Sequence, residues 1–275
     1  MRGCTGSDSA AVALVEARAL RKEYAPRNSF NGGSKTVAVD DVDFVIRQGS
    51  ICGLAGASGS GKSTLARCMA GLESPTGGEV LFRGAGIGAL PKTGRIQFHH
   101  CVQLVLQDAS NALNPRFGAA RAIAEPLAVA GIGTAASRRS QALYWMEALG
   151  LEIAAADRPV LEFSGGQRQR LTIARALTGN PELVIFDESF SALDLPLRAQ
   201  TLDLLRALHE KQRCDYLLIS HDLSLLAPIC DEIAVMYRGR IVEIARAAEL
   251  LSNPAHEYSR KLVQAIPRML PEAGA

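Results

Sequence analysis

The chain has 275 residues and a mass of 29.3 kDa. This is long enough to bury a large hydrophobic core, either in one broad α/β domain or in a main domain with a smaller lobe. It carries 30 Lys and Arg against 28 Asp and Glu, so its formal charge of +2 lacks the strongly basic field expected of a nucleic-acid binder. No apolar run approaches the roughly 18 residues that a membrane-spanning helix needs, and we therefore expect a cytoplasmic chain that meets a membrane only through its shape or a partner.

The cysteines and histidines give little sign of a metal site. Six cysteines are scattered without a Cys-x-x-Cys pair, which argues against a disulfide framework or a zinc ribbon and predicts that most are small buried side chains. His99, His100 and Cys101 are potential metal ligands in sequence. Neighbouring side chains on a strand alternate between its faces, so these three are not expected to share one ion.

The first elements predicted along the chain are strands. Val12 to Leu20 and Val37 to Ile46 have β-like composition, with a loop between them. Ile51 to Ala55 has the pattern of a buried strand, and Thr64 to Gly71 repeats apolar side chains at helical spacing. A strand, a glycine-rich turn and a helix in succession form the context in which a phosphate-binding loop is credible.

That glycine-rich turn reads Gly-Ala-Ser-Gly-Ser-Gly-Lys-Ser. Glycines let successive N–H groups turn inward around phosphate oxygens, and the following helix adds its positive end. Lys62 is placed to neutralise the β- and γ-phosphates, and the Ser63 hydroxyl is a hard oxygen ligand suited to Mg²⁺. The full spacing disfavours the alternative of a plain Gly/Ser-rich turn. The residues expected to bind nucleotide here are Gly56, Ala57, Ser58, Gly59, Ser60, Gly61, Lys62, Ser63 and Thr64.

A second buried strand is predicted to supply the acidic groups of the same site. Leu183 to Phe186 is apolar and is followed by Asp187 and Glu188. A magnesium nucleotide site usually has a carboxylate at the tip of a neighbouring buried strand, which makes Asp187 the candidate partner of the metal. Glu188 would face the γ-phosphate and polarise the attacking water as a general base. The alternative is a buried strand that ends in a solvated acidic turn.

The chain between Lys62 and Asp187 is longer than one crossover helix, which predicts an inserted unit at about residues 111–178. Arg138 to Leu149 has a helical pattern, and the stretch contains almost no convincing strand. The inserted unit is therefore expected to be a helical lobe. One face of that helix should carry Ala142, Trp145, Met146 and Leu149.

A third motif, Phe-Ser-Gly-Gly-Gln-Arg-Gln-Arg, begins at Phe163. Ser164 is expected to cap a helix and to present hydroxyl and N–H donors to an anion. The motif resembles the signature motif of ATP-binding cassette (ABC) proteins. In that family it reaches the γ-phosphate held by the opposite subunit, so the resemblance implies that two chains complete each site. The residues it would contribute are Ser164, Gly165, Gly166 and Gln167.

Further positions resemble elements of the same family. Tyr24 is similar to the aromatic residue that stacks on adenine, with a core tyrosine as the alternative. Gln107 is similar to the Q-loop glutamine that contacts magnesium, and Ser191 to Asp194 to the D-loop at the dimer seam. His221 resembles the switch histidine at the γ-phosphate, although a lone strand-end histidine is more often structural. The resemblance thus implies Mg²⁺ ligands at Ser63, Gln107 and Asp187, and catalytic roles for Lys62, Glu188 and His221.

The segments Leu106 to Asp108 and Leu113 to Arg116 and the tail from Leu250 to Pro267 resemble ATPases of peptide and nickel importers. Within that subgroup, Phe30 to Gly32 and Gly71 to Pro75 are most similar to ATPases of nickel importers. The fold that this implies is an α/β phosphate-loop NTPase cassette with a mixed β core, an antiparallel β subdomain and an inserted α-helical lobe. The nucleotide-binding domain would span residues 10–250, with the lobe at about 111–178, and residues 251–275 would form a short C-terminal extension.

The function implied is the ATP-binding and hydrolysing subunit of an ABC importer for peptides, nickel or a related metal chelate, with ATP and Mg²⁺ bound. Its expected partners are a second ABC ATPase subunit, identical or paralogous, two transmembrane permease subunits and an extracytoplasmic substrate-binding protein, with no nucleic acid. It would lie peripherally on the cytoplasmic face of the inner membrane. An ABC exporter subunit is one alternative. The other is a soluble ABC ATPase acting on nucleic acid or ribosomes, a class that tends to carry a long coiled coil or two cassettes, neither of which the sequence shows.

Overall fold

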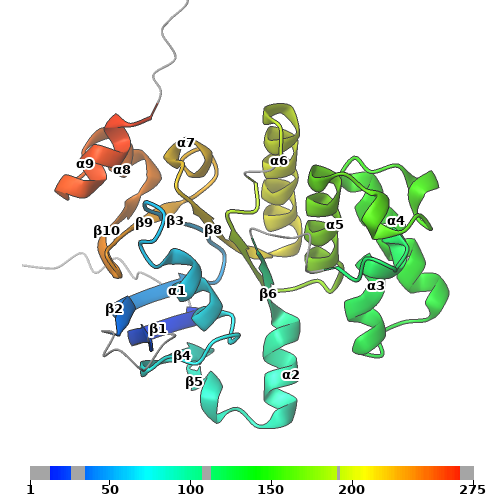
Figure 1. The fold of residues 1–275 in the computed structure, drawn as a ribbon, viewed down its shortest axis with the longest axis horizontal. Helices are drawn as coiled ribbons and strands as arrows, with labels where there is room; N and C mark the ends of the chain where they lie inside the picture. The colour runs from blue at the N-terminus through cyan, green and yellow to red at the C-terminus, as the bar shows by residue number, and fades with distance from the viewer. Residues whose placement is uncertain (1–12, 26–34, 107–112, 191–192, 267–275) are drawn as a thin grey trace, which may run out of the picture.

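The computed structural model describes residues 13–25, 35–106, 113–190 and 193–266 (Figure 1). Gln107, Ser191 and Ala192, to which the sequence assigns roles, lie outside these ranges. The described chain builds two β-sheets with helices packed against them. No helix in these ranges is long and apolar enough to cross a membrane.

The larger sheet has six strands in the order β10-β9-β3-β8-β7-β6, and only the β9–β10 pair is antiparallel. Strands β3, β7 and β8 are buried along their whole length, which explains why their sequences are runs of apolar residues rather than alternating ones. This is the predicted mixed β core. Its strands are β3 (Ile51–Ala55), β6 (Val102–Val105), β7 (Leu183–Asp187), β8 (Asp215–Ser220), β9 (Glu232–Tyr237) and β10 (Arg240–Arg246).

The smaller sheet is the predicted antiparallel subdomain, with the strand order β2-β1-β4-β5. In Figure 1 it lies beside helix α1 (Lys62–Met69), at the blue and cyan end of the colour scale. Leu65 and Met69 of α1 share one apolar core with this sheet and with one side of the larger sheet. The helix that follows the phosphate loop is therefore fixed between the two sheets. The strands are β1 (Ala13–Tyr24), β2 (Thr36–Arg47), β4 (Gly77–Phe82) and β5 (Ala85–Gly86).

Three helices follow β6 and gather on the side of the larger sheet away from the small one (Figure 1). They are α3 (Ala119–Val129), α4 (Ala135–Ala148) and α5 (Gly165–Thr178). Residues 113–182 contain no strand, only an isolated bridge between Gly118 and Pro159. The predicted apolar face of α4 is confirmed, since Ala142, Trp145, Met146 and Leu149 are all buried. The bounds proposed for the helical lobe stay a prediction.

The expectation that His99 to Cys101 lie on a strand is wrong. They end helix α2 (Lys92–Cys101), and β6 begins at the next residue. Phe98 and Cys101, three positions apart, are the buried residues of α2, and this spacing fits a helix face. Among the described residues, no group of three His, Cys, Asp or Glu side chains is arranged to hold a metal ion, and the five described cysteines are buried and free.

The chain closes with helices α6 (Leu195–Gln212), α7 (Leu223–Leu226), α8 (Ala247–Ser252) and α9 (Glu257–Gln264). Helix α8 crosses position 250, where the sequence places the end of the nucleotide-binding domain, and Leu250 is fully buried in the core. Figure 1 shows α8 and α9 beside the β9–β10 edge of the larger sheet. The last described segment therefore packs on the sheet that carries the phosphate loop.

Candidate functional site

The glycine-rich turn connects β3 to α1, and its backbone requires glycine. Gly61 caps α1 with φ 107°, a conformation that other residues rarely adopt. A Cβ atom at Gly61 would lie 2.2 Å from the carbonyl oxygen of Ala38, and one at Gly56 would lie 2.3 Å from that of Met236. Both glycines therefore allow the loop to pass close to neighbouring backbone.

Lys62, the first residue of α1, is only 4 % exposed. Its Nζ atom donates hydrogen bonds to the carbonyl oxygens of Gly56 at 2.8 Å and Ala57 at 3.0 Å, and lies 3.7 Å from Oε1 of Glu188. Burial lowers the pKa of Lys62, while the carboxylates of Glu188 and Asp187 oppose that shift. The ammonium group is thus held inside the loop, next to acidic groups at the end of another strand.

Ser63 and Asp187 meet directly, as the Ser63 hydroxyl donates a 2.9 Å hydrogen bond to Oδ1 of Asp187. Asp187 is 2 % exposed, and this burial raises its pKa against the opposing effect of the Ser63 bond. Contrary to the expectation that β7 adjoins β3, strand β8 lies between them. The three strands are parallel and end at the same edge of the sheet, which lets the first turn of α1 meet the end of β7.

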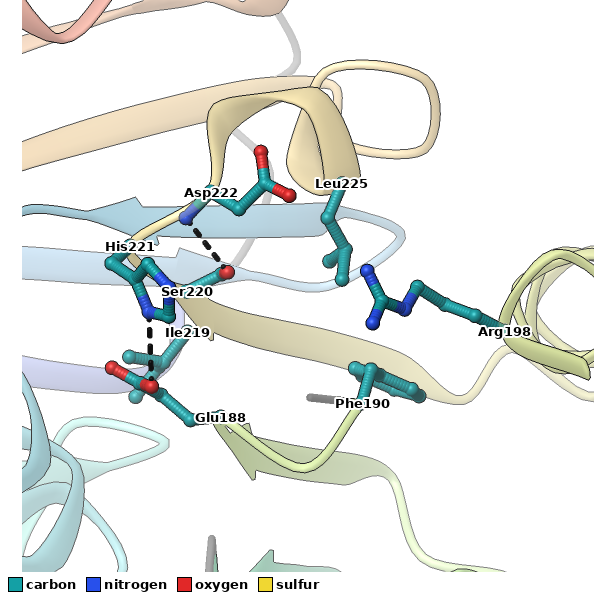
Figure 2. Close-up of a pocket in the computed structure, with 8 residues that line it drawn as sticks. All are labelled: Glu188, Phe190, Arg198, Ile219, Ser220, His221, Asp222 and Leu225. Carbon is teal, nitrogen blue, oxygen red and sulfur yellow. Dashed lines mark hydrogen bonds and ion pairs between the residues drawn. The ribbon is translucent and has the colours of Figure 1, made fainter. Parts of the chain in front are cut away.

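Glu188 and His221 follow β7 and β8, and their side chains point toward each other in Figure 2. Nδ1 of His221 lies 3.1 Å from Oε2 of Glu188. Glu188 has a left-handed backbone, with φ 49°, and its N–H donates to the carbonyl of Ile219 at 3.0 Å. This turn aims the carboxylate back across the sheet edge toward both Lys62 and His221.

Glu188 lies where two pockets meet. One pocket, of about 180 Å³, is lined by Glu188, Phe190, Arg198, Ile219, Ser220, His221, Asp222 and Leu225 (Figure 2). The other, of about 330 Å³, is lined by Ala38, Ser58, Gly59, Gly61, Lys62, Ser63, Thr64 and Glu188. The carboxylate is therefore placed between the cradle of the phosphate loop and the histidine.

Tyr24 ends β1 and lies beside α1. Its hydroxyl donates to Oε2 of Glu73 at 2.6 Å and lies 3.4 Å from Oγ1 of Thr64. The residue is 37 % exposed, and Nζ of Lys22 lies 5.4 Å from its ring centroid. The ring is thus tied near the phosphate loop without being part of the buried core.

The signature motif begins α5 as predicted. Ser164 accepts a hydrogen bond from the N–H of Gln167 at 3.3 Å, and the Gln167 side chain accepts one from the N–H of Ser164 at 2.9 Å. Ser164 and Gly165 are exposed, and residues 164–167 line neither pocket. The structure thus brings Lys62, Ser63, Asp187, Glu188 and His221 together and leaves the signature residues on a separate surface of the same chain.

Sequence reasoning missed two contacts of the phosphate loop. Ala38 of β2 lines the loop pocket, although an alanine within a strand pattern gives no signal of such a position. Tyr258 of α9 accepts a 2.9 Å hydrogen bond from the N–H of Ala57. The tail resemblance included Tyr258, but nothing in the sequence connected it with the loop.

The sequence and the fold are both similar to those of known proteins. The family model described as ABC transporter matches residues 39–191. The chain is 41 % identical to the oligopeptide transport ATP-binding protein OppF of Bacillus subtilis over 92 % of its own length and 82 % of the relative's. A Brucella ovis protein with the provisional name of peptide import ATP-binding protein is 40 % identical to this chain. The match covers 94 % of this chain and 80 % of that protein.

Among solved structures, the fold is similar to that of the ATP-binding cassette MJ0796, described as a dimer in a post-hydrolysis state bound to ADP and Pi. The TM-score is 0.78 and the sequence identity 27 %, over 85 % of this chain and 99 % of that one. The likeness therefore extends over nearly the whole of that cassette.

Proposed function

Because this chain belongs to the ATPase family of ABC transporters, we propose that it is the ATP-hydrolysing subunit of an importer whose cargo is a peptide. The relatives reported above carry peptide names, which favours peptides over nickel or a metal chelate. One observation carries the proposal for the site. Lys62, Ser63, Asp187, Glu188 and His221 converge at one edge of the sheet although they come from three separate stretches of chain.

The phosphate loop would hold the triphosphate of ATP. The loop at residues 56–64 would supply backbone N–H groups other than that of Ala57, which donates to Tyr258, and the start of α1 would supply its positive end. The Lys62 ammonium now donates to two loop carbonyls and would exchange them for phosphate oxygens. Tyr24, tied to Thr64 at the edge of the loop, is the candidate to stack on the adenine ring.

Side chains from the start of α1 and the end of β7 have the chemistry to hold a magnesium ion. The Ser63 hydroxyl and the Asp187 carboxylate are hard oxygen donors already within 2.9 Å of each other, which is the donor chemistry that Mg²⁺ prefers. We infer that Ser63 and Asp187 hold the ion, directly or through its waters, with Gln107 as a further ligand. When bound, Mg²⁺ neutralises charge on the phosphate oxygens.

Hydrolysis would depend on the groups around Glu188. Its carboxylate would accept a proton from the attacking water. His221 contacts that carboxylate through Nδ1 and is the candidate to donate a hydrogen bond to the γ-phosphate. Lys62 stabilises the charge that develops on the transferred phosphoryl group. The chain's own contribution is thus positioning and charge stabilisation.

The exposed signature segment supports a head-to-tail pair of cassettes. Ser164 to Gln167 form the N-terminus of α5, whose N–H groups can bind an anion. These residues do not line the phosphate-loop pocket of their own chain. We propose that the segment binds the γ-phosphate on a second ABC ATPase subunit. Closure of the pair would bias two permease subunits between their access states, at the cytoplasmic face of the inner membrane, with a substrate-binding protein on the other side.

The test is reconstitution of the chain with its permease subunits and binding protein in liposomes. We expect peptide added outside with the binding protein to stimulate ATP hydrolysis and to accumulate inside. Stimulation by nickel or a metal chelate and not by peptide would contradict the cargo assignment. Purification of the chain from cells with ribosomes, and without membrane subunits, would contradict the importer itself.

A further inference from the structure

The peptide plane between Gly56 and Ala57 is held from both of its polar ends. Its carbonyl oxygen, on Gly56, accepts a 2.8 Å hydrogen bond from Nζ of Lys62. Its N–H, on Ala57, donates a 2.9 Å hydrogen bond to the hydroxyl of Tyr258, which lies 201 positions away in sequence. Because the C=O and N–H of a trans peptide point in opposite directions, Lys62 and Tyr258 fix the same plane from opposite sides.

The Tyr258 side chain is itself held in place. Its ring stacks on that of Tyr237, the last residue of β9, with centroids 4.2 Å apart and an angle of 30° between the planes. The backbone N–H of Tyr258 donates to Nδ1 of His256 at 3.1 Å, and His256 thereby caps the N-terminus of α9. The ring stack and the helix cap therefore fix the position from which the Tyr258 hydroxyl contacts the loop.

A carboxylate anchors the segment just before Tyr258. Glu243 of β10 accepts hydrogen bonds from the N–H groups of Ala255 at 2.8 Å and His256 at 2.9 Å. Burial disfavours the charge on Glu243, but the donors around it outweigh this effect and lower its pKa. The sheet thus holds the start of α9 through charge-assisted hydrogen bonds.

We propose that Tyr258 is a positioning residue for nucleotide binding, and that its hydroxyl fixes the orientation of the first peptide plane of the phosphate loop. The inference rests on the proposed role of that loop in binding ATP. The N–H of Ala57 lies in an exposed part of the loop, and without the hydroxyl the plane between Gly56 and Ala57 would lose one of the two bonds that hold it. Rotation would move the carbonyl that orients Lys62 before nucleotide binds, so the free loop would be less preorganised for ATP.

Two matched variants test this role. Tyr258→Phe removes the hydroxyl and keeps the ring stack, whereas Tyr237→Phe keeps the stack and leaves the bond to Ala57 in place. For Tyr258→Phe we expect the Kd for magnesium-ATP, measured by calorimetry, to rise about fivefold, the loss associated with one hydrogen bond. The KM for ATP should rise by the same factor while kcat stays within about twofold. Tyr237→Phe should match the wild type in Kd and KM.

The outcomes separate the inference from the function on which it rests. If both variants bind ATP as the wild type does, Tyr258 only packs α9 against the sheet and the inference is overturned alone. If the wild type binds no ATP, the proposed function fails and the inference fails with it. A fall in unfolding midpoint shared by both variants, with no change in KM, would also assign Tyr258 a purely structural role.

Discussion

Nδ1 of His221 lies 3.1 Å from Oε2 of Glu188, and the other oxygen of that carboxylate lies 3.7 Å from Nζ of Lys62. One side chain thus spans the distance between the phosphate loop and the histidine. The left-handed backbone of Glu188 makes this possible by turning the chain sharply after β7. Substitution of Glu188 and substitution of Lys62 therefore test the carboxylate and the ammonium group of this arrangement separately.

Glu188→Gln should bind magnesium-ATP and lose most of its turnover. Glutamine keeps the shape of the side chain but cannot take a proton from water, and general-base catalysis contributes roughly 10²–10⁴-fold. Steady-state ATP hydrolysis and equilibrium nucleotide binding decide the matter. Glu182 directly precedes β7, at the opposite end of the strand from Glu188. Glu182→Gln therefore serves as the control and should keep full activity. Full turnover in Glu188→Gln would remove the general-base assignment.

Lys62→Ala should weaken nucleotide binding itself. The ammonium group is expected to bond directly to phosphate oxygens, and loss of hydrogen bonds to a charged group typically lowers affinity by roughly 10- to 100-fold. Titration with magnesium-ATP measures the effect, with Lys92→Ala on the exposed start of α2 as the control. Unchanged affinity together with reduced turnover would assign Lys62 to catalysis alone.

Gly165→Ala tests the role of the signature helix in a second subunit. A Cβ atom at Gly165 would contact nothing within 4 Å in this chain, and the same holds at Gly179, the residue that ends the same helix. If the start of α5 approaches a partner's nucleotide, Gly165→Ala should leave ATP affinity unchanged and lower turnover by about tenfold or more, since small displacements at a reacting centre are costly.

Gly179→Ala is the matched control for that experiment, because it adds the same methyl group at the far end of α5. It should hydrolyse ATP as the wild type does. Equal turnover in both variants would show that no close contact forms at Gly165.

The buried carboxyl group of Asp215 is expected to make the free energy of unfolding depend on pH, independently of catalysis. Burial raises the pKa of its carboxyl from 3.8 to about 6, against the opposing effects of the Gly49 N–H and of His209. Between these values the folded chain keeps a proton that the unfolded chain has lost, so stability falls as pH rises through this range. The loss is complete above about pH 6 and amounts to roughly 3 kcal/mol.

Urea unfolding of the wild type and of Asp215→Asn checks this effect. The amide cannot titrate but can still accept the hydrogen bond from Gly49. From about pH 4 to about pH 7, the wild type should lose roughly 3 kcal/mol of unfolding free energy relative to the variant. Parallel pH profiles for the two proteins would show that Asp215 has an ordinary pKa when folded.

The parts of the site with local sequence signals were predictable. The bounds of β3 follow from its apolar run, the loop from its glycine spacing and the start of α5 from the cap at Ser164. The order of the strands was not predictable, because pairing of β8 with both β3 and β7 is a property of distant segments. Tyr258 was out of reach for the same reason, as its bond to Ala57 joins residues far apart in the chain.

The position of β8 has a mechanical consequence for catalysis. Ala55, at the end of β3, pairs with Ser220, and Asp187, at the end of β7, pairs with Ile219. Strand β8 therefore helps to set the spacing between the lysine and the carboxylates, together with the direct contacts of Ser63 with Asp187 and of Lys62 with Glu188. Its interior residues Leu217 and Leu218 are fully buried and line neither the phosphate-loop pocket nor the pocket at His221. A change of their volume would widen or narrow this gap, and an ordinary packing defect would then be measured as a slower enzyme.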